Sequence, residues 1–230
     1  MTLKSKLIAL AVLGVAVAGG AYLYITRPVA APSTPAANLQ TEPEAPVAAN
    51  FVRYRIDPSS SRAIFRLDEV LRGEPKTVVG ETNQVTGDIL LDVTTPSNSR
   101  VEEVRVNART LQTDSSARDG AISRLILRSE QPENEFIVFK PTAFEGLPER
   151  IASDSAFGFR VTGDLTIAGI TKSVTFQGSA TIDETGRLVG TAATTVKRAD
   201  FNLVIPSVPF VANVQEEVNL QLQFAAVKLP

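Results

Sequence analysis

Regular alternation of apolar and polar residues in the stretch 157–182 is the feature that most constrains the fold. Apolar side chains recur at every second position over most of Phe157–Ile167, and the alternation resumes at Val174 after a short break. A period of two gives a β-strand one apolar and one polar face. The break, residues 168–172, contains Gly169, so the two runs are predicted to pair as a hairpin. A polar outer face is typical of an antiparallel sheet with one solvated side.

From Phe51 onward the chain is predicted to be almost entirely β. Further alternating runs are separated by turn residues and lie at 52–56, 63–67, 85–93, 104–108, 136–138, 188–196 and 218–226. Val101 is out of phase with the run that follows it, which predicts a β-bulge near Glu102. Eight or more strands with this spacing predict a closed or nearly closed antiparallel barrel. Such an interior is either filled by side chains or open to one ligand.

One short helix is predicted over residues 116–128. The stretch Thr113–Ser116 supplies candidate N-caps, and Ser116 followed by Asp119 resembles a capping box with Asp in place of Glu. Apolar residues then follow at helical spacing, while Gly120 limits the length of the helix.

The absence of cysteine and histidine excludes several classes of chemistry. Without thiols the chain has no disulfide, thiol catalysis or thiolate metal site. Without imidazole it has no Ser-His-Asp catalysis and no histidine-ligated zinc. A net charge of −2, with no cluster of Lys and Arg, argues against a nucleic-acid partner. Only Asp/Glu, Ser-Lys or oxygen-ligand metal chemistry remains open.

Residues 1–27 are predicted to be an N-terminal membrane anchor. The uncharged run 7–25 follows two lysines, and as a helix it would span about 28 Å, close to the hydrocarbon thickness of a bilayer. The flanking charges favour a cytoplasmic N-terminus and a single-pass topology in the cell membrane. The alternative is a signal peptide cleaved after Ala16-Val17-Ala18. Both interpretations place the C-terminal domain outside the cytoplasm.

Residues 28–50 are rich in proline and alanine and are predicted to be a linker. Such a composition cannot bury a core, so we expect an extended, semi-rigid spacer that holds the domain, residues 51–230, away from the membrane.

Several motifs in their order and spacing resemble those of the YceI-like family of exported lipid-binding domains. They are Tyr54-x-Ile56-Asp57-Pro58 with Ser61 and Phe65, Val79-Gly80, Thr113 with Arg118-Asp119, the segment Val161-Thr162-Gly163-Asp164-Leu165-Thr166-Ile167-x-Gly169-Ile170-Thr171-Lys172-x-Val174, and Arg198-x-Asp200-Phe201. The resemblance implies an all-β fold, an extended antiparallel eight-stranded lipocalin-like barrel with one short helix, whose lumen holds a long isoprenoid or similar amphiphile. The chain departs from the family pattern at Leu67-Asp68-Glu69, where members often carry a histidine, and at Asn202, where a glycine is usual.

The candidate ligand-binding residues are the apolar side chains expected to face the lumen. An apolar face of this kind either lines a ligand tunnel or fills a core. The candidates are Phe65, Leu67, Ile89, Leu91, Ile122, Ile126, Phe136, Val138, Phe157, Phe159, Val161, Leu165, Ile167, Val174, Phe176, Phe210 and Phe224.

Three further features each have two interpretations. Arg118 and Asp119 either meet a polar head group or simply begin the helix, where an acidic side chain is favourable. Glycines at 163, 178 and 190 either make room for a ligand or allow the sheet to bend, and bending is the favoured interpretation. The loop 206–212, which carries Phe210, is a lid, a lipid contact or an end plug.

The sequence therefore predicts a non-catalytic domain that binds or carries an amphiphilic lipid, such as a polyisoprenoid or quinone. No cofactor and no metal is expected. The sequence does not decide between a monomer and a homodimer. The alternative from another class is a structural or adhesive surface module with a filled core. A hydrolase or isomerase would need an inward-facing carboxylate, and strand parity supplies no clear one.

Overall fold

The computed structural model describes residues 23–24, 27–34, 50–152, 154–207 and 210–229. Most of the predicted anchor, 1–27, lies outside the described residues, as do positions 35–49 of the predicted linker. Within the described ranges, no helix is both long enough and apolar enough to cross a membrane.

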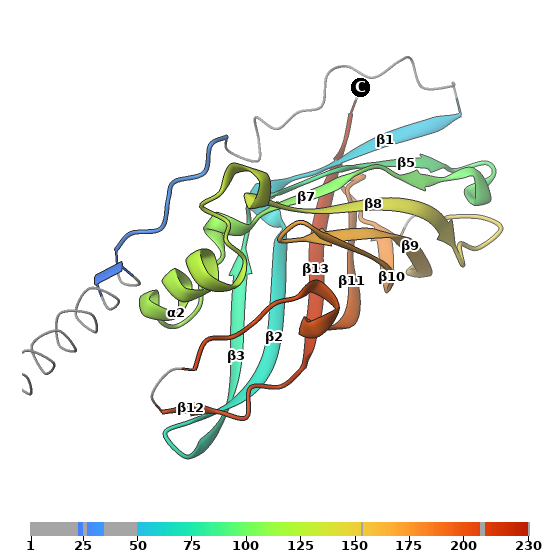
Figure 1. The fold of residues 1–230 in the computed structure, drawn as a ribbon. Helices are drawn as coiled ribbons and strands as arrows, with labels where there is room; N and C mark the ends of the chain where they lie inside the picture. Colours follow the sequence, from blue (N-terminus) through green and yellow to red (C-terminus); the bar gives the residue numbers. More distant parts are fainter. Residues whose placement is uncertain (1–22, 25–26, 35–49, 153, 208–209, 230) are drawn as a thin grey trace, which may run out of the picture.

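The described chain folds as one antiparallel β-sheet of thirteen strands. Figure 1 shows how the sheet curls. The strands are β1 (Phe51–Ile56), β2 (Arg62–Leu71), β3 (Glu74–Thr82), β4 (Val85–Thr86), β5 (Asp88–Asp92), β6 (Arg100–Val101), β7 (Val104–Asn107), β8 (Phe136–Glu145), β9 (Phe157–Ile167), β10 (Ile170–Ile182), β11 (Leu188–Lys197), β12 (Val211–Ala212) and β13 (Glu217–Lys228).

The sheet curls, and the strands at the two ends of its order are neighbours in the sequence. The order is β4-β7-β8-β9-β10-β11-β13-β1-β5-β6. Gly87 alone separates β4 from β5, and Glu102 and Glu103 separate β6 from β7, so the two ends of this order belong to one interrupted hairpin. The predicted bulge near Glu102 lies at the second interruption, where the Glu102 N–H donates to the Asp88 carbonyl oxygen at 2.8 Å.

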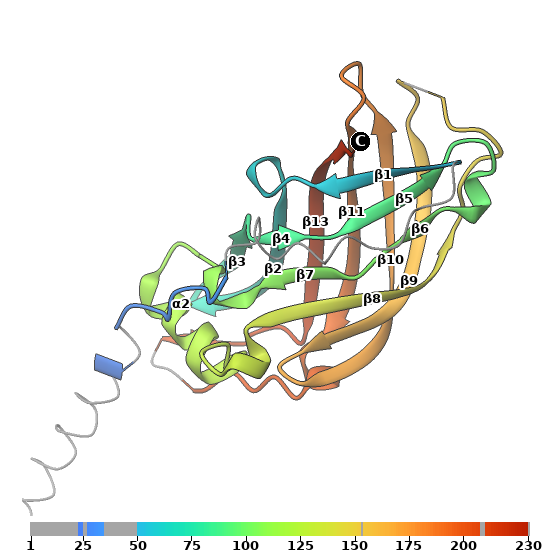
Figure 2. The same ribbon diagram turned by 90° about the horizontal axis from the view of Figure 1, so that it is seen from above.

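The two ends of β13 pair with different strands along one edge, and this makes the fold more extended than a simple barrel. Its C-terminal residues pair with β1 through Ala226–Lys228, whereas Asn219–Gln223 pair with β2. The β2–β3 hairpin therefore runs away from the curl formed by β1, β5, β7 and β8 (Figures 1 and 2). The structure thus confirms a curled antiparallel all-β fold with a short helix, and it subdivides the expected eight strands through these interruptions and the added hairpin.

The predicted helix is present but changes its type along its length. Helix α2 (Ser116–Ala121) is N-capped by Ser115, whose side chain accepts from the Arg118 N–H at 3.4 Å, and the π-helix η5 (Ile122–Ile126) continues it. The cap is one residue before the predicted Ser116. Short 3₁₀ helices are η2 (Pro58–Ser60), η3 (Pro96–Asn98), η4 (Ala108–Thr110), η6 (Pro132–Asn134) and η7 (Arg198–Phe201).

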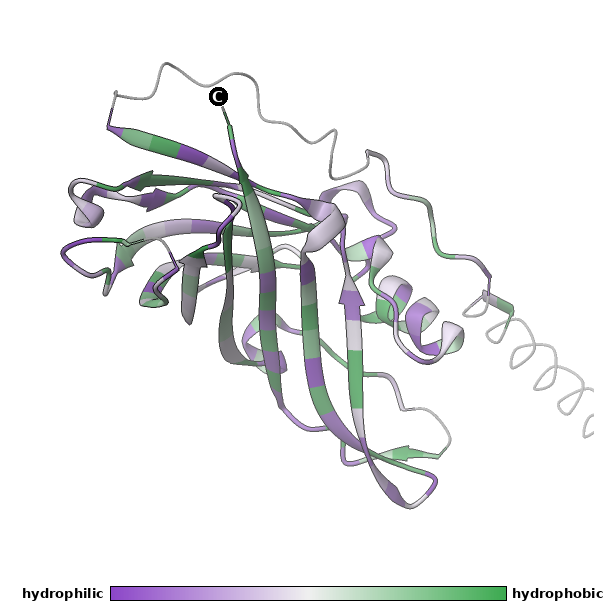
Figure 3. Ribbon diagram, turned by 180° about the vertical axis from the view of Figure 1, so that it is seen from behind, coloured by the Kyte–Doolittle hydropathy of each residue, from purple (hydrophilic) through white to green (hydrophobic). Residues whose placement is uncertain are grey.

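The alternating face of 157–182 has the position that its pattern predicts. In β9 the odd-numbered residues are buried and most even-numbered ones are exposed, and Ile167 pairs with Ile170 across a tight turn. Figure 3 shows the corresponding alternation of hydrophilic and hydrophobic bands along the long strands. The apolar side of the curl faces one core, to which β1, β5, β8–β11 and β13 all contribute.

A buried carboxylate joins β1 to β5. Asp88 accepts hydrogen bonds from Arg53 at 3.0 Å and from Arg55 at 2.8 Å, and its side chain is 7 % exposed. Burial alone would raise the pKa of Asp88, but the hydrogen bond and charge of Arg55, together with those of Arg53, outweigh burial and lower it.

Stability should fall in acid in part through Asp88. Because the folded pKa lies below the unfolded value of about 3.9, the contribution is complete above that pH and is lost as the pH falls through the lowered pKa. Urea unfolding from pH 6 to pH 2.5 should show this loss. Asp88→Asn should cost about 3 kcal/mol at neutral pH, since it removes the carboxylate shared by Arg55 and Arg53 and leaves Arg53 with the more distant Glu102, 3.6 Å away, and it should flatten the acid slope.

Glu145→Gln is the matched control for this ion-pair prediction. Its partner Arg160 lies 4.0 Å away, and both side chains are more than half exposed. The change should be within about 0.5 kcal/mol. Equal losses for the two variants, or an unchanged acid slope in Asp88→Asn, would contradict the assignment.

Candidate functional site

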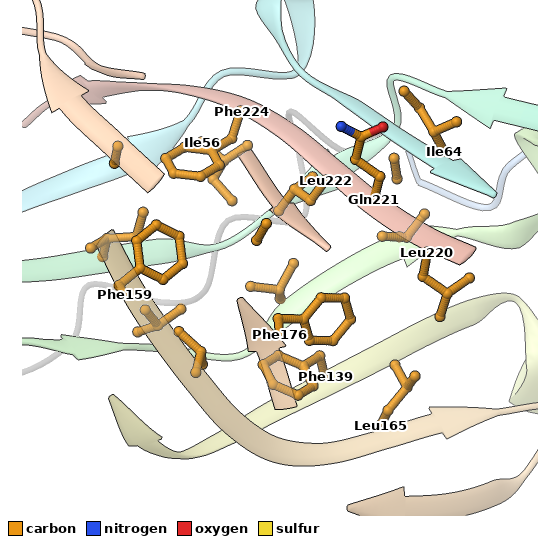
Figure 4. Close-up of a pocket in the computed structure, with 18 of the residues that line it drawn as sticks. Ile56, Ile64, Phe139, Phe159, Leu165, Phe176, Leu220, Gln221, Leu222 and Phe224 are labelled. Carbon is orange, nitrogen blue, oxygen red and sulfur yellow. The ribbon is translucent and has the colours of Figure 1, made fainter. Parts of the chain in front are cut away.

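An apolar cavity of about 170 Å³ lies inside the curled sheet (Figure 4). Its walls come from strands on all sides of the curl and from Leu111, which precedes α2. Among the described residues that line it, Gln221 is the only polar one. The lining consists of Ile56, Ala63, Ile64, Phe65, Ile89, Leu91, Val101, Val104, Val106, Leu111, Ile137, Phe139, Phe144, Phe157, Phe159, Val161, Leu165, Ile167, Phe176, Ala180, Leu188, Ala192, Leu220, Gln221, Leu222 and Phe224.

Ten of the seventeen lumen candidates lie in this lining. They come from β2, β5, β9, β10 and β13. They are Phe65, Ile89, Leu91, Phe157, Phe159, Val161, Leu165, Ile167, Phe176 and Phe224. Their contact with a ligand stays a prediction.

Four further candidates pack against the same core without lining the cavity. These residues are partly buried and come from β2, η5 and β10. They are Leu67, Ile122, Ile126 and Val174.

Strand β8 turns the opposite face inward from the one expected. Ile137 and Phe139 line the cavity, so Phe136 and Val138, with the other parity, do not. The Phe136 ring instead lies under the Arg105 guanidinium, 4.9 Å from its centroid. The prediction failed here because residues 136–139 are four consecutive apolar residues, which carry no parity signal.

A bulge in β8 then reverses the parity along the strand. The register with β9 shifts between Pro141 and Ala143, so Phe144 faces inward although it is an odd number of residues from Phe139. Two edge-to-face aromatic pairs result. Phe139 and Phe176 have centroids 5.0 Å apart, and Phe144 and Phe159 have centroids 5.7 Å apart. Such pairs hold rings in fixed orientations and so shape the cavity wall.

Phe210 is not part of the cavity. It is 73 % exposed with a φ of +69°, and its carbonyl oxygen accepts from the Arg72 N–H at 2.7 Å. Because the next residues pair with the end of β2, the loop lies beside the tip of the β2–β3 hairpin, which corrects the expectation that Phe210 faces the lumen.

The two head-group candidates are engaged in contacts of the helix N-terminus. Asp119 accepts hydrogen bonds from the Thr113 N–H and hydroxyl at 2.8 and 2.7 Å. Arg118 pairs with Glu69 at 3.0 Å and with Asp114. Neither residue lines the cavity, which agrees with the simpler interpretation that they begin the helix.

The other lining residues were not predicted as ligand-binding candidates. Most of them nevertheless lie on the apolar faces of the strands that were predicted from alternating residues. Val104, Val106, Ala180, Leu188 and Ala192 continue predicted strand patterns. Gln221 has the opposite parity from Leu220 and Leu222, and no periodic signal marks it. Its side-chain oxygen accepts from Arg66 at 2.7 Å.

The cavity favours apolar ligands and offers little for catalysis. No Asp, Glu, Ser, Thr or Lys is present among the described lining residues. In the described part of the chain no three acidic side chains gather as a metal site. An apolar cavity of about 150 Å³ stays dry and binds benzene. The lining therefore suits a hydrocarbon group better than a polar one.

Comparison with known proteins agrees with this geometry. Residues 54–226 match the YceI-like domain family. The chain belongs to that family. The match covers the curled sheet and the short helix, so this YceI-like domain comprises nearly all of the described fold. A search of curated proteins found no match.

Solved structures with the same fold share little sequence with this YceI-like domain. A polyisoprenoid-binding domain from Saccharophagus degradans, implicated in plant cell wall breakdown, has a TM-score of 0.59 and 12 % identity, covering 76 % of this chain and 98 % of that one. Burkholderia cenocepacia BcnA has a TM-score of 0.57 and 14 % identity, covering 75 % and 99 %. A Campylobacter jejuni YCEI protein has a TM-score of 0.52 and 15 % identity, covering 66 % and 84 %.

Proposed function

We propose that the domain binds an amphiphilic lipid with a long hydrocarbon chain, such as an isoprenoid or quinone, in its lumen and catalyses no reaction. The observation that carries this proposal is the wall of the cavity, which is apolar apart from Gln221. Each buried CH₂ contributes about 0.8 kcal/mol, so a hydrocarbon chain needs few polar contacts. The fold shared with a polyisoprenoid-binding domain supports the same ligand class.

The volume of the cavity requires that the wall adjusts to such a chain. Pockets for drug-sized ligands are typically about 300–1,000 Å³, whereas this cavity has about 170 Å³. A long chain therefore has to displace side chains of the wall. The same small volume favours the second candidate, a structural module with a filled core.

The proposal includes a location outside the cytoplasm, with the run 7–25 as the membrane segment. Its support is the apolar run with its preceding lysines. A homodimer stays a prediction.

Mass spectrometry of organic extracts distinguishes a lipid-binding domain from a filled module. The full-length protein, purified in a mild detergent, should release one class of long-chain lipid in roughly stoichiometric amount. A membrane protein of unrelated fold, purified from the same cells with the same detergent, controls for bulk lipid. Absence of an enriched lipid in repeated preparations would contradict the binding proposal and favour the filled core.

A further inference from the structure

Two buried arginines hold the backbone of an N-terminal segment against the domain. Arg124 in η5 has a side chain with no exposed surface, and its Nη2 donates to the carbonyl oxygens of Arg27 and Pro28, both at 2.7 Å. Arg109 in η4 donates to the Ala31 carbonyl oxygen at 3.3 Å. We name residues 27–33 the N-terminal strap.

Each arginine is itself fixed by a glutamate of the domain. Arg124 pairs with Glu130 at 2.9 Å, and Arg109 pairs with Glu135 at 2.9 Å. The same glutamates contact the strap: Glu130 pairs with Arg27 at 2.6 Å, and Glu135 accepts from the Ser33 N–H at 2.7 Å. The strap is thus held by the two pairs Arg124–Glu130 and Arg109–Glu135, whose side chains contact its backbone and the Arg27 side chain.

These contacts change the role expected for the proline- and alanine-rich stretch. A spacer beginning at Pro28 would place the domain at the end of an extended chain, about 3.1 Å longer with every residue. In the structure the strap lies on the domain instead. Only residue 26 separates Ile25, the end of the proposed membrane segment, from Arg27, and two residue steps span at most about 7 Å.

We propose that the strap fixes the η5 end of the domain against the membrane surface, an inference that rests on the proposed membrane segment. The side chains at this end suit a bilayer interface. The Arg27 guanidinium lies 4.5 Å from the centroid of the half-exposed Tyr24 ring, and Leu125 of η5 is 38 % exposed. Aromatic and basic residues of this kind are enriched where a chain leaves the membrane. The occupant of this face is therefore the lipid bilayer.

Because the natural chain has no cysteine, a single bimane label can report on the orientation. The full-length protein would be placed in nanodiscs containing brominated lipid, with Leu125→Cys or Glu184→Cys labelled. Position 184 lies in the β10–β11 turn, far from α2 and η5 in Figure 2. Quenching should be severalfold stronger at 125 than at 184. Equal quenching would overturn the orientation.

A double variant, Arg27→Ala with Ser33→Pro, tests the strap itself. It removes one ion pair and one donated N–H while leaving the Arg124–Glu130 and Arg109–Glu135 pairs intact. Because the contacts of Arg124 and Arg109 with the strap carbonyl oxygens remain, quenching at 125 should fall partway toward the level at 184. Thr34→Pro is the matched control, because it keeps the Ser33 N–H, and it should quench as the parent does.

Hydrogen exchange tests docking of the strap separately from insertion of the proposed membrane segment. A charge-assisted hydrogen bond should slow exchange of the Ser33 amide by about tenfold or more. An unprotected amide would overturn the docking. A protected amide in a protein that does not enter nanodiscs would overturn the membrane segment, and neither result depends on whether lipid copurifies with the lumen.

Discussion

Replacing Ala192 by phenylalanine should weaken lipid binding by more than tenfold while the domain stays folded. Ala192 on β11 lines the cavity and is only partly buried, so a larger side chain has room there. A cavity of about 150 Å³ accepts a benzene ring, so the new ring would occupy the space that the ligand needs. Excluding even two CH₂ groups of a ligand costs about 1.6 kcal/mol, or more than tenfold in affinity. Fluorescence titration with all-trans-retinol, a short isoprenoid, measures the loss.

Thr191→Phe is the control for this substitution. Thr191 is adjacent on β11 and exposed on the opposite face of the sheet, so its ring would point to solvent. Retinol affinity should match that of the parent, and both variants should retain cooperative thermal unfolding. If Ala192→Phe bound retinol as tightly as Thr191→Phe, the ligand would not occupy the cavity.

The β9–β10 hairpin could be predicted from sequence because one periodic signal determines both its structure and its faces. Phe157, Val161 and Leu165 lie on one face, and a one-residue slip would expose all of them. The turn at Ala168-Gly169 has φ values of +48° and +82°, and Gly169 was the signal that located it.

The face of β8 could not be predicted, because its information lies in the pairing of strands. Four apolar residues at 136–139 fit either parity, and the bulge between Pro141 and Ala143 changes the parity within the strand. Phe139 and Phe144 became lining residues through these two features. A local pattern cannot specify a register that is set by β7 and β9.

The docked strap could not be predicted for a different reason. Arg109 and Arg124 bind carbonyl oxygens of Ala31 and Arg27, and a backbone carbonyl is the same in every residue. Composition predicts that residues 28–50 bury no core of their own. It carries no information on whether part of that stretch lies on another surface.

Gly163→Ala should destabilise the domain by about 2 kcal/mol. Gly163 pairs with Pro141, beside the bulge that changes which residues of β8 face inward. A Cβ added at Gly163 would contact the Lys140 carbonyl oxygen and lie 2.7 Å from the Pro141 Cα, so backbone atoms would have to move. This close approach supports bending of the sheet, rather than room for a ligand, as the role of Gly163.

Gly158→Ala provides the matched comparison within β9. The atom nearest to a Cβ at that position is the Gly178 carbonyl oxygen at 3.9 Å, an ordinary contact, so the lower entropy of the unfolded chain should make the change neutral or stabilising by up to about 1 kcal/mol. In calorimetry, Gly163→Ala should lower the Tm by about 4–8 °C, at about 2–4 °C per kcal/mol for a domain of this size. Equal Tm values for the two variants would mean that β8 can move away from β9 at little cost. The bulge would then not fix the inward faces of Phe139 and Phe144, and the shape of the lumen would have to be set by its side chains alone.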